Sequence, residues 1–220
     1  MEDARAWRLV ASIPGPGVAV RMRPASPIRL HAPPAYRADC NCPILVEPGG
    51  TTVFFAHFVP IGHSYRRSGP SLDELGPAAP IRILDDPDPG LGKWIESVWR
   101  APDGALFGWY HAEAVAPCPD RLMTCHVGAL VSTDDGRSWR MLGHVLRAAP
   151  HAIDCSFRNG GMAGGYGDFT VVVDEGSAHF YLHFTSYDPL EGHQGIVVAR
   201  YPVAARDRPA EAVEMWTSDG

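Results

Sequence analysis

Two acidic residues recur at matching positions in the sequence. Glu96 and Asp168 each stand eight residues before a glycine, Gly104 and Gly176 respectively. Acid–base hydrolysis of a glycosidic bond needs two carboxyl groups, one protonated and one ionised. Mutual repulsion would raise the pKa of one of them, as the acid requires. The structural alternative is that each carboxylate caps a strand or pairs with an arginine.

Histidines recur in the same register as these acids. His57, His111 and His183 each follow a glycine (residues 50, 104 and 176) by seven residues. Inward-facing imidazoles could bind sugar hydroxyls, and three of them together could hold a zinc ion. The alternative is a repeated structural histidine that bonds to the backbone of a neighbouring element.

The elements that must position these side chains are strands. Residues 42–57, 96–111 and 168–183 align without gaps as strand, glycine turn and strand, rich in β-branched and aromatic residues. Third and fourth strands are expected at 126–132 and 139–145, and again at 194–200 and 213–216. Four antiparallel strands in each repeat are typical of a propeller blade. The predicted fold class is all-β.

Composition excludes several classes of protein. The net charge of −6, without a basic cluster, argues against a nucleic-acid partner. No apolar run is long enough for a membrane span, and residues 1–5 do not resemble the start of a signal peptide. The five cysteines are therefore expected to be reduced in the cytoplasm. A Cys118–Cys125 disulfide is the alternative and would require export.

One local motif is more specific than the repeats. Residues 132–139 match the pattern S-x-D-x-G-x-x-W at every defined position. Asp134 can accept hydrogen bonds from backbone N–H groups of the turn, Gly136 can adopt a positive φ, and Trp139 can pack between strands. The motif resembles the Asp-box found between the third and fourth strands of propeller blades. It argues for the fold and not for a reaction.

With these repeats and this motif, residues 39–217 resemble the five-bladed propeller glycosidases of the arabinanase/xylosidase and invertase/levansucrase type. The Asp-box (BNR repeat) is shared with six-bladed sialidases. The resemblance implies a single propeller domain over 1–220, with blades at about 39–90, 94–147 and 166–217 and a partial blade in 1–35. A closed ring takes about 4–8 blades. We therefore expect an incomplete ring that could self-associate.

The resemblance also implies roles for the acids at the starts of the inner strands. Glu96 would be the general acid, Asp39 the base or nucleophile, and Asp168 the carboxylate that tunes the acid or orients the sugar. The first repeat departs from the pattern, because Cys42 occupies the equivalent position and Asp39 lies three residues upstream. The order Asp, Glu, Asp along the chain also differs from the family order Asp, Asp, Glu.

The expected substrate is a carbohydrate, and the expected reaction is hydrolysis of its glycosidic bond. Trp94 and Tyr166, each two residues before an acid, could stack on sugar rings, and His111 and His126 could bind hydroxyls. Arg66, in an expected loop over 62–69, could hold an anion. No cofactor is expected, although a central cation such as calcium could be held. The alternatives are a non-catalytic propeller that binds glycans or proteins, and a glycoside phosphorylase.

Overall fold

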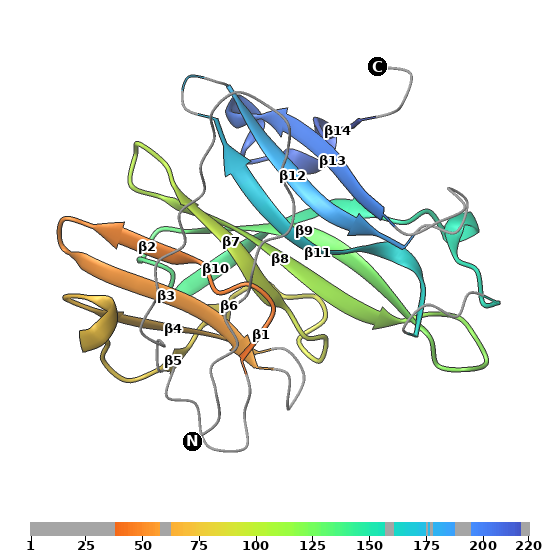
Figure 1. Cartoon of the computed structure of the whole chain (residues 1–220), viewed down its shortest axis with the longest axis horizontal. Helices are drawn as coiled ribbons and strands as arrows, with labels where there is room; N and C mark the ends of the chain where they lie inside the picture. Colours follow the sequence, from red (N-terminus) through yellow and green to blue (C-terminus); the bar gives the residue numbers. More distant parts are fainter. Residues whose placement is uncertain are drawn as a thin grey trace, which may run out of the picture.

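The chain folds into three successive antiparallel units, which we call sheets; parallel pairing of residues 123–125 with 162–165 joins the second and third into one nine-stranded sheet. The computed structural model describes residues 38–57, 63–156, 161–174, 176, 178–187 and 195–216, so the expected partial blade in 1–35 lies outside the described residues. Figure 1 shows the sheets following one another in chain order across the molecule. In the described ranges, the helical turns are all short 3-10 segments. None of the helices in these ranges is long and apolar enough to cross a membrane.

The first sheet contains β2 (Ile44–Glu47), β3 (Gly50–His57), β4 (Ser64–Gly69) and β5 (Ala79–Pro80), and β1 (Ala38–Asp39) pairs with the far end of β3. The expected loop over 62–69 is therefore wrong for Ser64–Gly69. This polar segment forms a strand because it pairs with β3, and its buried Arg67 donates hydrogen bonds to the carbonyl oxygens of Gly76 and Leu75.

The second sheet contains β7 (Trp94–Arg100), β8 (Leu106–Val115), β9 (Met123–Ser132) and β10 (Ser138–Arg147), each antiparallel to the next. The short β6 (Arg82–Ile83) pairs with the start of β10 in parallel. The segment that leaves the first sheet therefore adds a strand to the outer edge of the second.

The third sheet contains β11 (Met162–Val173), β12 (His179–Ser186), β13 (Gly195–Pro202) and β14 (Glu214–Met215). β11 begins six residues before Asp168, because its first residues pair in parallel with β9. A Cβ atom on Gly165 would lie 2.1 Å from the carbonyl oxygen of Cys125, so this close parallel approach requires glycine.

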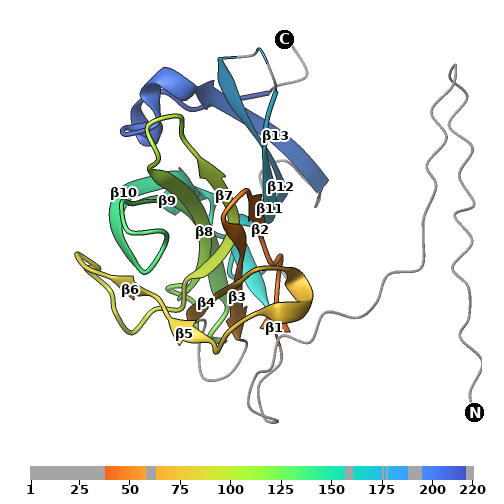
Figure 2. The ribbon, with the colours of Figure 1, turned by 90° about the vertical axis from the view of Figure 1, so that its left-hand side faces the viewer.

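Large apolar side chains fill both seams between sheets. Figure 2 shows the sheets stacked face to face. The buried cluster between the first and second sheets includes Phe54, Tyr110 and Trp139. The cluster between the second and third includes Trp109 and Phe180, with ring centroids 5.0 Å apart. These seams hold the inner strands β2, β7 and β11 in a fixed relation.

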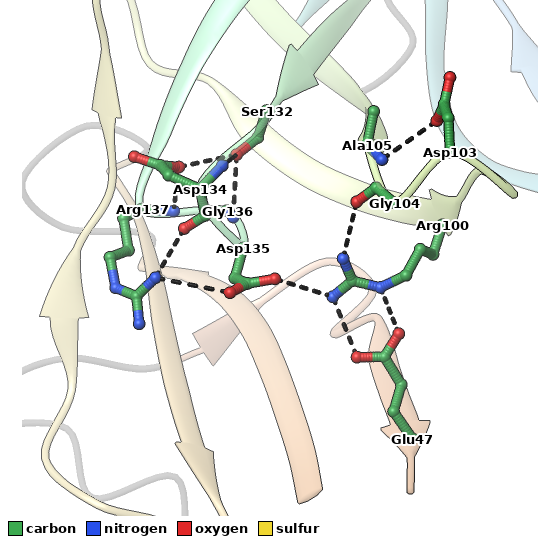
Figure 3. Close-up of polar contacts among 10 residues, drawn as sticks. All are labelled: Glu47, Arg100, Asp103, Gly104, Ala105, Ser132, Asp134, Asp135, Gly136 and Arg137. Atoms are coloured by element: carbon green, nitrogen blue, oxygen red, sulfur yellow. Dashed lines mark hydrogen bonds and ion pairs between the residues drawn. The ribbon is translucent and has the colours of Figure 1, made fainter. Parts of the chain in front are cut away.

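The turn over 132–139 has the expected geometry (Figure 3). Asp134 Oδ1 accepts hydrogen bonds from the backbone N–H groups of Arg137 and Ser138, at 3.1 and 2.8 Å. Partial burial opposes ionisation, but these hydrogen bonds outweigh it and lower the pKa of Asp134 to about 2. Gly136 has a φ of +75°, and Trp139 is fully buried. The predicted roles of Asp134, Gly136 and Trp139 are confirmed.

Beside this turn, Arg100 connects the first two sheets. Its guanidinium bonds to both carboxylate oxygens of Glu47 at the end of β2 and to Asp135 Oδ1 at 3.2 Å (Figure 3). It also donates to the carbonyl oxygen of Gly104 at 2.9 Å. The turn thus stabilises the outer end of the seam, away from Glu96.

The cysteine pairing differs from both expectations. Cys118, after β8, forms a disulfide with Cys155, after β10, and their Cα atoms lie 5.4 Å apart. Cys125 is a free, buried thiol within β9. The Cys118–Cys125 alternative is wrong because strand pairing places Cys125 opposite Glu113, inside the sheet.

Candidate functional site

The two repeated acids lie on β-bulges at the start of the second and third sheets. The pairing of β7 with β8 shifts between Ile95 and Ser97, and that of β11 with β12 shifts between Gly167 and Phe169. A bulge turns the extra residue's side chain away from the regular alternation, and bulges are common beside active sites. Asp168 also has a φ of +40°, which is uncommon for a residue other than glycine.

These bulges bring the two acids together. One ligand atom from each of Cys40, Glu96, His111 and Asp168 lies within 4.8 Å of those of the other three. We call these four residues the hub cluster. The convergence expected from the repeat spacing is confirmed for Glu96 and Asp168, and neither forms an ion pair with lysine or arginine within the described ranges.

Glu96 is the buried centre of the hub cluster. Its side chain is 1% exposed, and Oε1 bonds to His111 Nδ1. Oε2 accepts hydrogen bonds from the backbone N–H of Phe169 at 3.2 Å and from Asn41 Nδ2 at 3.3 Å. Asn41 Nδ2 also donates to the carbonyl oxygen of Phe169 at 2.7 Å. Glu96 therefore joins all three sheets, and both of its oxygens are already occupied.

His111 lies between the buried and the open parts of the site. Its ring stacks on Trp94 with centroids 4.7 Å apart and planes 4° apart. Burial alone would lower the pKa of His111, but the Glu96 carboxylate outweighs burial and the net shift is upward. Its Nε2 faces Glu113 Oε1 across 4.0 Å. His111 is thus held between two carboxylates.

Glu113 was not among the residues predicted from the sequence. It lies two positions after His111 on β8, so strand alternation places both side chains on one face. That period of two is the signal that could have found it. Burial, together with nearby Asp168 and Asp39, raises the pKa of Glu113 although His111 opposes the shift. Its side chain is 32% exposed, so solvent reaches it.

The first sheet contributes the segment between β1 and β2. Asp39 accepts a hydrogen bond from the backbone N–H of Cys40 at 3.0 Å and is not one of the four residues of the hub cluster. Cys40 has a φ of +59°, and its Sγ lies 3.9 Å from His111 Nδ1. Burial, Glu96 and Asp39 raise the pKa of Cys40. The repeat alignment places Cys42 and Asp39 here, and neither Cys40 nor Asn41 was assigned to the site from the sequence.

His126 does not share this site, contrary to expectation. It pairs with Ala112 across β8 and β9, whereas Glu113 pairs with Cys125, so His126 lies on the opposite face from His111 and Glu113. Its ring lies 4.3 Å from that of His144, in a cavity of about 450 Å³ that also contains Asp88 and Arg147.

Two other expected substrate-binding residues also lie apart from the hub cluster. Tyr166 is 8% exposed and packs edge-on against Phe184 in the seam between the second and third sheets. Arg66 lies on β4, the third strand of its sheet, where it lines a shallow cavity with Thr52 and Asp135. Trp94 does lie beside the cluster, but it is 6% exposed and covered by the ring of His111.

The repeated histidines are not equivalent in space. In the second sheet, His111 pairs with Trp94, which lies two residues before Glu96. The equivalent position in the third sheet is Tyr166, two residues before Asp168, and it pairs with Ser186 instead of a histidine. His183 is exposed and pairs further along the strand, with Thr170. The side chain of His57 lies outside the described residues. A zinc site made of the three repeated histidines is therefore wrong.

Comparison with solved structures decides the fold. A thermostable family-43 glycoside hydrolase matches 81% of this chain with a TM-score of 0.53 and 10% identity. An endo-arabinase from Bacteroides thetaiotaomicron VPI-5482 matches 80% with a TM-score of 0.51 and 12% identity. The fold is a β-propeller. The GH93 alpha-L-arabinofuranosidase of Fusarium graminearum, solved with arabinobiose, matches 76% with a TM-score of 0.51 and 13% identity.

The likeness extends over part of each larger structure. The chain spans 54%, 61% and 47% of these three proteins, about half their length. No family model matches the sequence, and neither does any curated protein. At 10–14% identity the likeness establishes the propeller fold alone.

Proposed function

We propose that this propeller is a glycoside hydrolase whose reaction takes place at the open side of the hub cluster. The observation that carries the proposal is the convergence of Glu96 and Asp168, with carboxylate oxygens within 4.8 Å, at bulges in two adjacent inner strands. Hydrolysis of a glycosidic bond needs two carboxyl groups in one site, and this convergence holds Asp168 in the same cluster as His111, which faces Glu113.

Accessibility divides the carboxylates into two kinds. Glu96 has a side chain that is 1% exposed, and it accepts hydrogen bonds from two other sheets, so a substrate oxygen cannot reach it without breaking them. It acts as a positioning residue, which departs from the general-acid role expected from the family resemblance. Asp168 is exposed and Glu113 is partly exposed, so these two can touch a substrate.

Asp168 and Glu113 supply the catalytic pair in this proposal. Both adjoin His111: Asp168 through the hub cluster, and Glu113 Oε1 across 4.0 Å from His111 Nε2. One carboxyl group protonates the glycosidic oxygen while the other activates water or attacks the sugar carbon. Asp39, beside Cys40, orients the sugar at the edge of the same site.

The structural neighbours give a starting point for the substrate class. Two of them are an endo-arabinase and an alpha-L-arabinofuranosidase, so we propose α-L-arabinofuranosides as the first substrates to test. A non-catalytic glycan-binding propeller is the second candidate, favoured by the complete hydrogen bonding of Glu96. The phosphorylase alternative depended on Arg66 or Arg67 holding phosphate. Arg66 lines the cavity with Thr52 and Asp135, and Arg67 is buried and donates to the carbonyl oxygens of Gly76 and Leu75.

A direct assay separates the two candidates. The purified chain is incubated with 4-nitrophenyl glycosides and with arabino-oligosaccharides, and released nitrophenol and reducing sugar are measured. The proposal expects turnover that Glu113→Gln and Asp168→Asn each reduce by about 10²–10⁴. Saturable oligosaccharide binding by calorimetry without any turnover would instead establish the binding propeller.

A further inference from the structure

We propose that Cys40, Glu96, His111 and Asp168 bind one transition-metal ion, most suitably Zn²⁺. Their ligand atoms, a thiol sulfur, an imidazole nitrogen and two carboxylate oxygens, all lie within 4.8 Å of one another. This inference goes beyond the proposed glycosidase activity and does not rest on it. The ion would be a component of the fold at the point where three blades meet.

A tetrahedral site requires one pair of ligand atoms to approach slightly and another pair to separate. Bonds from zinc to sulfur, nitrogen and oxygen are about 2.0–2.3 Å, so ligand atoms around one tetrahedral ion lie roughly 3.3–3.8 Å apart. Cys40 Sγ and His111 Nδ1 are 3.9 Å apart, close to this range. Glu96 Oε1 and His111 Nδ1 already contact each other and would separate to admit the ion between them.

Outer hydrogen bonds already orient the central ligand. Glu96 Oε2 is held by the Phe169 N–H and by Asn41 Nδ2, which leaves Oε1 as the oxygen that points to the cluster. Trp94 stacks against His111 and fixes the plane of its ring. Metal sites in proteins commonly have such a second layer of contacts that fixes each ligand's direction.

The charge of the site also favours a cation. Glu96 and Asp168 lie in the cluster, and Glu113 Oε1 is 4.0 Å from His111. Of these three carboxylates, none contacts a lysine or arginine in the part of the chain that the structure describes. A divalent ion would supply the missing positive charge, and exposed Asp168 gives it a path from solvent.

The donor set selects the kind of metal. Calcium and magnesium prefer sites made only of oxygen, whereas thiolate and imidazole together favour zinc and related transition metals. The site therefore differs from the central calcium that was expected as an option. Asp168 is an exposed ligand, and its coordination position is one at which water can exchange.

Metal titration of the purified chain tests the inference. The protein is stripped with a chelator and titrated with ZnCl₂ or CoCl₂ while metal content, thermal unfolding and absorption are recorded. We expect one ion per chain, tetrahedral Co²⁺ bands with thiolate-to-cobalt charge transfer, and a Tm rise of about 5–10 °C at a hundredfold excess over Kd.

Matched variants locate the ion. Cys40→Ser should abolish the charge-transfer band, and Asp168→Asn should weaken binding at least tenfold, whereas Cys42→Ser, two residues away, should change neither. Absence of bound metal, or a charge-transfer band that survives in Cys40→Ser, would overturn the inference. Binding that is lost only in His144→Gln would place the ion beside His126 and would also overturn it. Glycoside turnover is measured separately, so the two proposals can fail independently.

Discussion

The backbone N–H of Phe169 donates a hydrogen bond to Glu96 Oε2 across 3.2 Å. This bond joins the residue after Asp168 in the third blade to the buried carboxylate of the second. A second hydrogen bond joins the same two strands: the Val171 N–H donates to Ser97 Oγ at 3.0 Å. The position of exposed Asp168 is therefore set by a carboxylate that does not itself reach solvent.

Removing that carboxylate should destabilise the propeller. Glu96→Ala leaves the Phe169 N–H without its acceptor and removes one of the two acceptors of Asn41 Nδ2, and we expect it to lower the free energy of unfolding by about 2–4 kcal/mol. Glu96→Gln should cost less, because its amide oxygen can accept these bonds while its NH₂ group faces His111 Nδ1. Urea denaturation measures both. Ser97→Ala, which removes a neutral acceptor at the same seam, should cost only about 1 kcal/mol. Equal stability of Glu96→Ala and the parent chain would contradict this account.

The repeat spacing predicts the strands and the convergence of Glu96 and Asp168, because both depend on local patterns that recur along the chain. It does not predict which histidine joins them. The hairpin between Arg100 and Leu106 contains five residues, 101–105, whereas that between Val173 and Phe180 contains six, 174–179. One extra residue shifts the register, and with it the face and level of every later side chain.

Other features depend on contacts between distant segments. The early start of β11 requires pairing with β9, and the Cys118–Cys155 bridge requires that the loops after β8 and β10 lie together. Nothing local in the sequence specifies either contact. Glu113 could have been found from its spacing to His111, because alternate residues of a strand share a face.

Acid should destabilise the protein through His126. Burial, with repulsion from neighbouring cations, lowers the pKa of His126 from 6.5 to about 3. The charged and titratable groups around it are His144, Arg147, Lys93, His111 and Asp88, and the ring of Tyr110 lies 6.5 Å away. The unfolded chain therefore binds a proton first as the pH falls, so stability is fully present above pH 6.5 and decreases down to about pH 3.

Equilibrium unfolding between pH 7 and pH 3 measures this effect. His126→Gln should flatten the pH dependence over that range, whereas His183→Gln, at an exposed histidine, should leave it unchanged. An identical pH profile for His126→Gln and the parent chain would show that His126 is not the group responsible.

Alanine substitutions at two glycines should distinguish destabilisation by steric clash from destabilisation by backbone strain. Gly136 and Gly143 have φ values of +75° and +95°, but a Cβ on Gly136 would lie 2.5 Å from the Phe54 ring, whereas none of the described atoms lies within 4 Å of one on Gly143. Gly143→Ala should cost about 1 kcal/mol from the left-handed backbone alone. Gly136→Ala should cost about 1–3 kcal/mol more, because Phe54 must move. Thermal unfolding compares them, and equal losses would contradict the tight packing of the 132–139 turn.

The disulfide predicts a thiol count. Of five cysteines, Cys40, Cys42 and Cys125 are free, so the denatured, unreduced chain should titrate three thiols. Peptide mapping under non-reducing conditions should recover a Cys118–Cys155 cross-link after expression in an oxidising compartment. A Cys118–Cys125 cross-link in the folded protein would contradict the pairing.

The hydrolysis rate of Asp168→Asn is the measurement that tests the central claim most directly. Asp168 is exposed at a bulge within β11, and Asp174, directly after the last residue of that strand, is an exposed aspartate outside the hub cluster. Initial rates on 4-nitrophenyl α-L-arabinofuranoside and on arabino-oligosaccharides are compared for the parent chain, Asp168→Asn and Asp174→Asn. The account predicts turnover by the parent chain, an unchanged rate for Asp174→Asn, and a loss of about 10²–10⁴ for Asp168→Asn, with the thermal stability of the metal-free protein retained. Hydrolysis at the parental rate by Asp168→Asn, or no hydrolysis by the parent chain, would contradict it.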